Sequence, residues 1–398
     1  MGYEQEHIPS KSDLSIADYE MLAHGTNRLK TMDAEALDFS MLGFFGEAGS
    51  LLSAVKKRKR DDIPTARYIR AVEEELGDFL WYYTLVAKSC GCALEPLAQA
   101  AANRPVRRAK GVRFSDVQSQ FHRAKRAPLD RLIRQLILLA GEAGRFVDFY
   151  SRKRTTIDAT EAEGHLVPIF KSLLRAASAA GIDLQDAAIE NLHKTYDRWP
   201  PKSAKVYPDP LDNHHKDETE KLPRQLDICI EQRRKRNKPY VFQSCNGIYI
   251  GDPLTDNIRD EDFYRFHDVF HYAYAAKFGW SPVTRALFKL KRKSDPETDE
   301  AEDGARAILI EEGISTMIFN YAKDLHLFEG IELGELSFEL LKKIREFVAG
   351  YEVAKTPLWL WEEAILEGYE CFRFLREHKK GVVHLDMTKR SLTVTVLN

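Results

Sequence analysis

The sequence predicts a mainly α protein, in which a duplicated helical bundle precedes a mostly helical C-terminal domain with a small β-hairpin. Three observations predict this fold class. Residues 1–200 carry apolar side chains at the 3.6-residue period of amphipathic helices. The helical segments of this half match one another in pairs. After residue 224 the apolar and polar residues alternate as in strands, and the helical period returns from residue 260.

The composition is that of a globular protein. The chain has 398 residues, 44% hydrophobic and 30% charged, which is enough for two or three domains with sizeable cores. Its 59 Lys and Arg against 61 Asp and Glu give a net charge of −2, so there is no strong signal for nucleic-acid binding. Five scattered cysteines do not suit a disulfide framework or a zinc ribbon. Without an apolar leader or an 18-residue apolar stretch, we expect a cytoplasmic protein with no membrane partner.

Two copies of one helical motif form the first half of the chain. Two pairs of segments match: LGFFGEAGSLLSAVKKRKR (42–60) with LLAGEAGRFVDFYSRKR (138–154), and CGCALEPLAQAA (90–101) with AGIDLQDAAIEN (180–191). The shared GEAG and the common helix–loop–helix spacing favour duplication over chance similarity. We therefore predict one repeat over residues 1–112 and a second over residues 113–203.

The pattern of polar and apolar residues changes where the second half begins. Residues 204–226 are polar and contain proline, which predicts a linker. The domain at 227–398 starts with the alternating segments QLDICIEQ and YVFQSCNGIYIG, and the basic QRRKRNK between them predicts the turn of a hairpin. Helical segments follow, and the tail HLDMTKRSLTVTVLN suits one further strand.

Acidic residues on two helices of the first repeat form a candidate metal site. Glu75 and Asp78 are three residues apart, so they share one helix face. Glu47 lies on the preceding helix, with Ser50 three residues after it. Facing carboxylates can assemble an all-oxygen site for Mg²⁺ or Mn²⁺, which can bridge phosphate oxygens and activate water. Spacing alone leaves open that these acids are ordinary surface charges.

Four segments of this repeat carry a family resemblance: ADYEMLAHGT (17–26), LGFFGEAGSLLSAVKK (42–57), EELGDFLWYYTLVA (74–87) and the ALEPLAQAA that follows. They resemble the MazG-like all-α nucleoside triphosphate pyrophosphohydrolases. The resemblance implies hydrolysis of a ribo- or deoxynucleoside triphosphate to the monophosphate and pyrophosphate. It also implies Mg²⁺ held by an ExxE pair on one helix and an ExxD pair on the next. No family is recognised for the C-terminal half.

Carried over by position, the resemblance makes Glu47, Glu75 and Asp78 the metal ligands and catalytic residues. Ser50 stands where the family has its fourth acid, which reduces the charge available to neutralise the ion. Four nearby acids are candidates to replace it, and the sequence does not choose among them: Asp61, Asp62, Glu73 and Glu74.

Two further residues of the first repeat are expected to bind the substrate. Tyr82 matches a position that resembles the family's phosphate-contacting tyrosine. Lys56 begins the basic run KKRKR, which either attracts the polyanionic nucleotide or is a solvated helix end.

The second repeat keeps a different part of the family pattern. It has Glu142, but the other acidic positions hold Arg145, His165 and Pro168, so no metal site is expected there. Its segment IENLHKTYDRWP (189–200) resembles the family's phosphate-binding tail.

That tail implies that Asn191, Lys194 and Arg198 contact the phosphates across the bundle; ordinary polar residues at a helix end are the alternative. Family members usually build their sites from paired subunits. The two repeats are therefore expected to form an internal pseudo-dimer, and a homodimer stays open.

A second candidate site lies in the C-terminal half. His267 and His271 in YRFHDVFHYAY are four residues apart on one helix face, a spacing that suits metal ligation. With Asp268, and with Glu311 and Glu312 in the apolar segment ILIEEGIS, they offer a metal or acid–base site, and a hydrogen-bonded pair of core histidines is the alternative.

Two other functions stay open. Through Ser50, the chain is alternatively a nucleotide-binding sensor that has lost turnover and uses its C-terminal half as the effector. Otherwise the chemistry lies at the C-terminal histidines, as in a metal phosphohydrolase or another nucleotide-cleaving enzyme.

Overall fold

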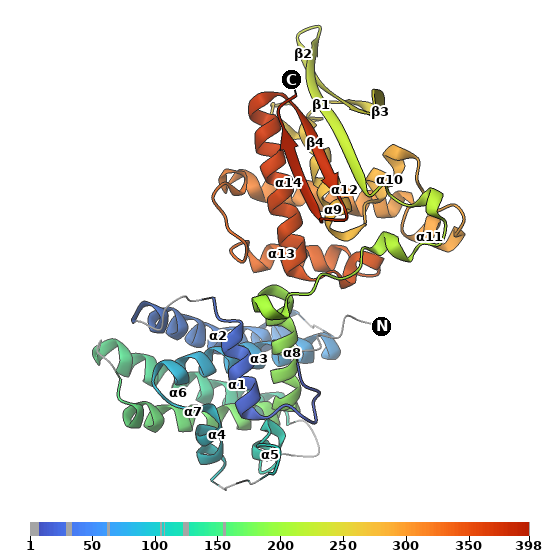
Figure 1. Cartoon of the computed structure of the whole chain (residues 1–398). Helices are drawn as coiled ribbons and strands as arrows, with labels where there is room; N and C mark the ends of the chain where they lie inside the picture. The colour runs from blue at the N-terminus through green and yellow to red at the C-terminus, as the bar shows by residue number, and fades with distance from the viewer. Residues whose placement is uncertain are drawn as a thin grey trace. The chain divides into compact units, whose positions relative to one another are not determined.

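The chain folds into two compact units that divide between Ala204 and Lys205 (Figure 1). The computed structural model describes residues 8–28, 34–61, 64–103, 106, 108–121, 127–153 and 157–397. Within them the first unit is built from helices, and the second adds an antiparallel sheet, so the predicted mainly α class is confirmed. No helix in these residues is long and apolar enough to cross a membrane.

The first unit is built around two long helical hairpins. Its α-helices are α1 (Ile16–Gly25), α2 (Ala34–Asp61), α3 (Thr65–Ser89), α4 (Leu94–Ala102), α5 (Phe114–Gln118), α6 (Leu129–Lys153), α7 (Ala159–Ala180) and α8 (Leu184–Arg198). Helix α2 packs against α3, α6 packs against α7, and α2 also contacts α6. A continuous apolar core runs through all of these helices, so the predicted repeats 1–112 and 113–203 share one core.

The short helices are exchanged between the two hairpins. Helix α4 follows α3 but packs mainly on α7, and α8 follows α7 but packs on α3. Reciprocal packing of this kind is what a tandem duplication with approximate two-fold symmetry produces. It brings α8 of the second repeat onto the acidic helix of the first.

Local sequence signals set several helix ends. Asp158 caps α7 by accepting a hydrogen bond from the backbone N–H of Thr160, and Glu161 completes the capping box. Gly181 ends the same helix with φ +70°, a left-handed conformation that glycine adopts without strain. Asp183 then caps α8.

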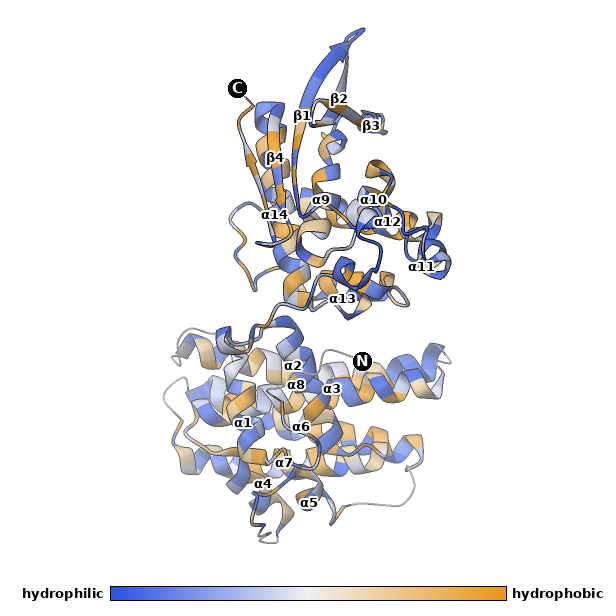
Figure 2. Cartoon of the chain, turned by 45° about the vertical axis from the view of Figure 1, so that its right-hand side comes forward, coloured by the Kyte–Doolittle hydropathy of each residue, from blue (hydrophilic) through white to orange (hydrophobic). Residues whose placement is uncertain are grey.

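The second unit contains a larger sheet than the predicted hairpin. Its strands are β1 (Gln225–Lys235), β2 (Lys238–Cys245), β3 (Ile248–Leu254), β4 (Lys380–Asp386) and β5 (Ser391–Thr395). They form one antiparallel sheet in the order β3-β2-β1-β4-β5. The sheet exceeds the hairpin because YVFQSCNGIYIG turns at Asn246 and Gly247 into a third strand. The tail, predicted as one strand, contributes to two: β4 pairs with β1, and β5 pairs with β4. The tip of the β1–β2 hairpin is hydrophilic (Figure 2).

Helices pack against this sheet. They are α9 (Asp268–Phe278), α10 (Pro282–Phe288), α11 (Pro296–Ala301), α12 (Ala305–Lys323), α13 (Phe338–Phe347) and α14 (Leu358–His378). Helices α9 and α14 pack against each other and against β4 and β5. Gly368 permits their close approach, because a Cβ there would lie 3.3 Å from Ala273 and Phe270 side-chain atoms.

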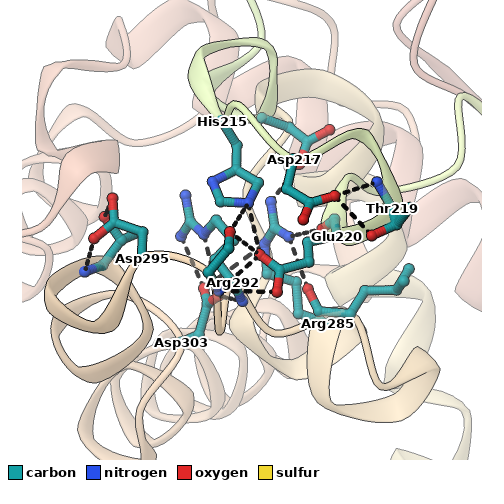
Figure 3. A network of polar contacts seen from close by, with 12 residues as sticks. His215, Asp217, Thr219, Glu220, Arg285, Arg292, Asp295 and Asp303 are labelled. Carbon is teal, nitrogen blue, oxygen red and sulfur yellow. Dashed lines mark hydrogen bonds and ion pairs between the residues drawn. The ribbon is translucent and has the colours of Figure 1, made fainter.

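Residues 204–226, predicted as a linker, differ from that expectation: from Lys205 onward they pack within the second unit. Asp212 is fully buried and forms ion pairs with Arg285 and Arg224. Nearby, His215 and Glu220 hydrogen-bond to each other beside a buried pair of Arg292 and Asp303 (Figure 3). The polar residues of this segment are therefore partners in an internal network rather than the solvated side chains of a linker.

Candidate metal and nucleotide site

The three predicted acids of the first repeat lie together. Glu47 on α2 and Glu75 and Asp78 on α3 each place a carboxylate oxygen within 4.8 Å of the others. The three-residue spacing of the α3 acids puts both on the face that packs against α2. All three side chains are half-buried. An all-oxygen set of this kind is the donor set that Mg²⁺ and Mn²⁺ prefer.

The electrostatics of the cluster favour a cation. Burial, and then the charges of Asp78 and Glu75, raise the pKa of Glu47 to about 8. Burial likewise raises the pKa of Glu75. It raises the pKa of Asp78 as well, although Lys194 opposes the shift. Three carboxylates crowded in this way resist ionising together, and a divalent ion supplies the charge that would allow it.

Two residues of the second repeat complete the cluster. The Lys194 ammonium lies 2.5 Å from Asp78 Oδ2 and 2.7 Å from Glu74 Oε1. The Asn191 amide donates a hydrogen bond of 2.9 Å to Asp78 Oδ1. Both come from α8, so the residues expected to act across the bundle do lie beside the acids of the first repeat.

Gly77 makes this approach possible, and the sequence interpretation missed it. A Cβ at Gly77 would lie 2.7 Å from the Ala187 carbonyl oxygen and 2.9 Å from Asn191 Cβ. Any larger residue would push α8 away from α3. A second missed residue is Tyr19, whose hydroxyl donates a 3.4 Å hydrogen bond to the Asn191 amide oxygen. The signal for Gly77 was available in the sequence, since a glycine inside a long helix usually has a packing reason.

The other predicted substrate-binding residues differ in their accessibility. Ser50 is half-buried on α2, one turn after Glu47, and Lys56 is exposed further along the same helix. Tyr82 is half-buried and lies against Gly43, and burial, then the Glu47 charge, raises the pKa of its phenol. Arg198 is only 1% exposed, with its guanidinium over the ring of Trp199, so it is not presented to a substrate as Lys194 is.

Of the acids considered as replacements for the missing fourth ligand, Glu74 is connected to the cluster through Lys194. It shares the Lys194 ammonium with Asp78. Glu73 instead lies near Asp186 and Glu190; burial and then these charges raise its pKa. Asp61 pairs with Arg60, and Asp62 lies outside the described residues.

An open cavity of about 650 Å³ adjoins the cluster. Its lining residues are Arg70, Glu73, Glu74, Asp186, Glu190, Asn191 and Lys194. This volume is within the range of sites for small molecules and cofactors. Glu47, Glu75 and Asp78 are not among these lining residues. The cavity is connected to them through Lys194 and Asn191, which line it and contact Asp78.

The corresponding positions of the second repeat are occupied differently. The Arg145 guanidinium donates a 3.2 Å hydrogen bond to Glu142. The ring of His165 lies 5.3 Å and 4.7 Å from the ring centroids of Phe146 and Phe149. Glu142 is thus paired with an arginine, and the His165 imidazole packs against two aromatic rings.

The predicted C-terminal residues also converge. His267, Asp268 and His271 are buried and place donor atoms within 4.8 Å of one another at the start of α9. Glu311 on α12 is 2.9 Å from His271 Nδ1. Its neighbour Glu312, in the same apolar segment ILIEEGIS, lies 3.5 Å from His271 Nε2.

One family model matches the C-terminal half of the chain. Residues 207–398 match the family model of the MazG C-terminal domain. The match points to the MazG family. This is the family that the first repeat resembles, but the match lies in the half for which no family was recognised, so that expectation is corrected. No curated protein and no solved structure matches the chain.

The MazG match agrees with the fold at one boundary. It begins at residue 207, inside the segment expected to be a linker, close to the point at which the second structural unit begins. A MazG-type C-terminal domain is consistent with a role in nucleotide pyrophosphohydrolysis.

Proposed function

We propose that this protein is a Mg²⁺-dependent nucleoside triphosphate pyrophosphohydrolase. It would cleave ribo- or deoxynucleoside triphosphates to the monophosphate and pyrophosphate. The observation that carries the proposal is the convergence of Glu47, Glu75 and Asp78 with Lys194 and Asn191 beside an open cavity. The resemblance of the first repeat and the MazG match in the same chain support it.

The acidic residues would bind the metal ion, and the basic residue would bind the phosphates. Glu47, Glu75 and Asp78 would hold Mg²⁺, with Mn²⁺ as the substitute; when bound, the ion neutralises phosphate charge and polarises the attacking water. Lys194 now neutralises Asp78 and Glu74, and in the complex its ammonium becomes available to the triphosphate. Asn191 holds the Asp78 carboxylate in orientation.

The reaction consumes one water molecule. Its oxygen bonds to the α-phosphorus, the bond from that phosphorus to the bridging oxygen of the β-phosphate breaks, and the water proton is released.

One observation favours a second candidate. Ser50 replaces an acid of the family pattern, which weakens the charge around the ion and fits a nucleotide-binding sensor without turnover. In that case the C-terminal unit would act as the effector.

Phosphorus NMR of the products separates these functions. The full chain is incubated with Mg²⁺ and a panel of ribo- and deoxynucleoside triphosphates. We expect monophosphate and pyrophosphate, with kcat/KM reduced about 100-fold or more in Glu75→Gln, since the ligand set loses one charge. The matched control is Glu142→Gln in the second repeat, which removes a paired surface acid and should change the rate less than about twofold.

A third variant, His267→Ala, tests the C-terminal alternative. Turnover that is lost in His267→Ala but kept in Glu75→Gln would contradict the proposal. So would free base or orthophosphate as the first product. Nucleotide binding without any turnover in the wild type would favour the sensor.

A further inference from the structure

The C-terminal unit contains a histidine- and carboxylate-lined centre that the proposed pyrophosphohydrolase does not use. His267 and Asp268 lie at the start of α9, and His271 follows one turn later. Their donor atoms lie within 4.8 Å of one another, and the three residues are at most 6% exposed. Burying so many ionisable groups together has a cost unless a further partner compensates it.

One nitrogen in this centre has only a long contact to a partner. His271 is fully buried, and among the described residues its Nε2 makes no hydrogen bond. Its ion-pair neighbour, Glu312 Oε1, lies 3.5 Å away, which is longer than a good hydrogen bond. A buried nitrogen that the protein satisfies poorly costs free energy, and an ion bound between it and the carboxylate would remove that cost.

The opposite nitrogen of each imidazole is already engaged. His271 Nδ1 is 2.9 Å from the fully buried Glu311, which also accepts hydrogen bonds from the Ser281 hydroxyl and the Val283 N–H. His267 Nδ1 is 2.8 Å from the Tyr264 carbonyl oxygen. Such bonds fix the ring orientation, so that Nε2 of each imidazole faces a carboxylate, Asp268 or Glu312. In the carboxylate–histidine–metal arrangement of known metal centres, the ring nitrogen opposite the orienting bond is the one that binds the ion.

Hydrogen bonds also hold the carboxylate of Asp268 in orientation. The Gln243 amide on β2 donates to Asp268 Oδ2, and Gln243 in turn accepts a 2.6 Å hydrogen bond from the Tyr272 hydroxyl. Asp268 Oδ1 is left facing His267 Nε2 at 3.1 Å. Glu312 lies 3.7 Å from the same nitrogen through its second carboxylate oxygen.

These separations match the edges of a metal coordination shell. In a tetrahedral site with bonds of about 2.0–2.2 Å, the ligand atoms lie about 3.3–3.6 Å apart. The 3.1 Å from His267 Nε2 to Asp268 Oδ1 and the 3.5 Å from His271 Nε2 to Glu312 Oε1 lie near this value. The other oxygen of Glu312 lies 3.7 Å from His267 Nε2. We propose that His267, Asp268, His271 and Glu312 form a binding site for one divalent transition-metal ion, with Glu311 orienting His271.

Zn²⁺ is the ion that this donor set fits best. Two imidazole nitrogens favour a transition metal over Mg²⁺, and two carboxylates balance the charge of a dication. The Glu312 side chain is 37% exposed, so the site has an opening to solvent on that side. The two units of the chain would then hold ions of different chemistry, an oxygen-ligated Mg²⁺ and a nitrogen-and-oxygen-ligated Zn²⁺.

Metal titration of the full chain tests this inference without any assay of turnover. The chelator-treated protein is kept in excess Mg²⁺ and titrated with Zn²⁺, and with Co²⁺ as a visible reporter of the ligands. We expect one Zn²⁺ per chain by elemental analysis and visible Co²⁺ absorption bands of a nitrogen- and oxygen-ligated ion. The Zn²⁺ Kd should rise about 100-fold in His267→Gln and about tenfold in Glu312→Gln.

Two control variants test whether a loss of Zn²⁺ affinity is specific to the proposed ligands. His384→Ala changes a half-exposed histidine on β4 that hydrogen-bonds to Asp227, and it should leave Zn²⁺ affinity unchanged. Glu75→Gln should also leave it unchanged, which separates this site from the acidic cluster. Because Glu312 is partly exposed, Glu312→Gln should fold even where His267→Gln does not, and circular dichroism checks both. Absence of Zn²⁺ uptake by the wild type, or equal affinity in Glu312→Gln, would overturn the proposal.

Discussion

The α2–α3 and α6–α7 hairpins of the first unit share a scaffold but carry different side chains where they face their partners. In α2–α3 three carboxylates converge. In α6–α7 the equivalent acid, Glu142, is paired with Arg145, and His165 lies against aromatic rings. The comparison teaches that apolar packing alone maintains the hairpin geometry. The chemistry can therefore be confined to one copy without loss of the fold.

The second repeat also contributes side chains to the acidic cluster. Its α8 crosses onto α3 and supplies Asn191 and Lys194 to Asp78. One repeat thus provides the anionic groups and the other the groups that neutralise and orient them. Neither repeat contains the whole group of contacting side chains.

The largest expected effect tests the crossing of α8 over α3. Gly77→Ala places a methyl group 2.7 Å from the Ala187 backbone carbonyl, so α8 must shift. We expect the first unit to lose about 1–3 kcal/mol of stability, as overpacked sites do. Thermal unfolding followed by circular dichroism measures this loss, and Mg²⁺ affinity should fall with it.

A glycine in the second copy provides the matched control. Gly164 lies on α7, is exposed, and has no atom within 4 Å of an added Cβ. Gly164→Ala should leave stability unchanged or raise it by up to about 1 kcal/mol, because alanine is the better helix former. Equal effects of the two substitutions would show that the α3–α8 approach is not tight.

A smaller effect concerns the pH dependence of the acidic hairpin. The pKa of Glu47 is raised in the folded state to about 8, so its contribution to stability is complete below about 4.5 and is lost as the pH rises through 8. Mg²⁺ binds the ionised form. We therefore expect the metal-free first unit to weaken between pH 6 and pH 9, and Mg²⁺ to reverse the loss.

The measurement is Tm at pH 6 and pH 9 with and without Mg²⁺. At about 100 times its Kd, the ion should add about 2.7 kcal/mol, or roughly 5–10 °C for a unit of this size. Glu47→Gln should reduce both the pH dependence and the Mg²⁺ effect, because Glu75 and Asp78, whose pKa values are also raised, remain, whereas Glu142→Gln should leave both unchanged. An equal Mg²⁺ effect in the two variants would contradict the assignment of the ion to α2–α3.

The smallest effect is expected from restoring the missing acid. Ser50→Glu adds a carboxylate one turn after Glu47, where Glu74 and Lys194 already balance the charge near Asp78. In an adapted enzyme kcat/KM should change less than about threefold. Steady-state kinetics with the preferred triphosphate measures it. A large gain from a near-zero base would instead favour the sensor and sharpen the contrast between the two copies.

The sequence predicted the parts of the fold that depend on local periodicity. The helical hairpins, the β1–β2 pair and the tail strand follow from apolar spacing and turn residues. The complete sheet does not, because the pairing of β1 with β4 joins residues more than 150 positions apart, such as Ile228 and Val383. The nature of residues 205–226 was missed for a similar reason. The sequence alone does not show whether a charged side chain of this segment is solvated or forms an ion pair with a buried arginine such as Arg285.

The candidate sites were predictable where residues share a helix face. Glu75 with Asp78, and His267 with His271, are close because of the helical repeat alone. Their partners on other helices required tertiary information. Lys194 was expected at the phosphates and lies on Asp78, Arg198 is buried, and Glu312 rather than its neighbour Glu311 faces the open side of the histidine centre.

The burial of Asp212 under Arg285 bears on how the two units can be separated or exchanged. A fragment starting at residue 227 would lack Asp212 and leave the Arg285 guanidinium, 1% exposed, with its longer 3.7 Å carboxylate contact, to Asp303. A fragment starting at Lys205, where the second unit begins, would keep the pair. The polar stretch after Ala204 is therefore the first structural element of the C-terminal unit, and a gene fusion that exchanges this unit should include it.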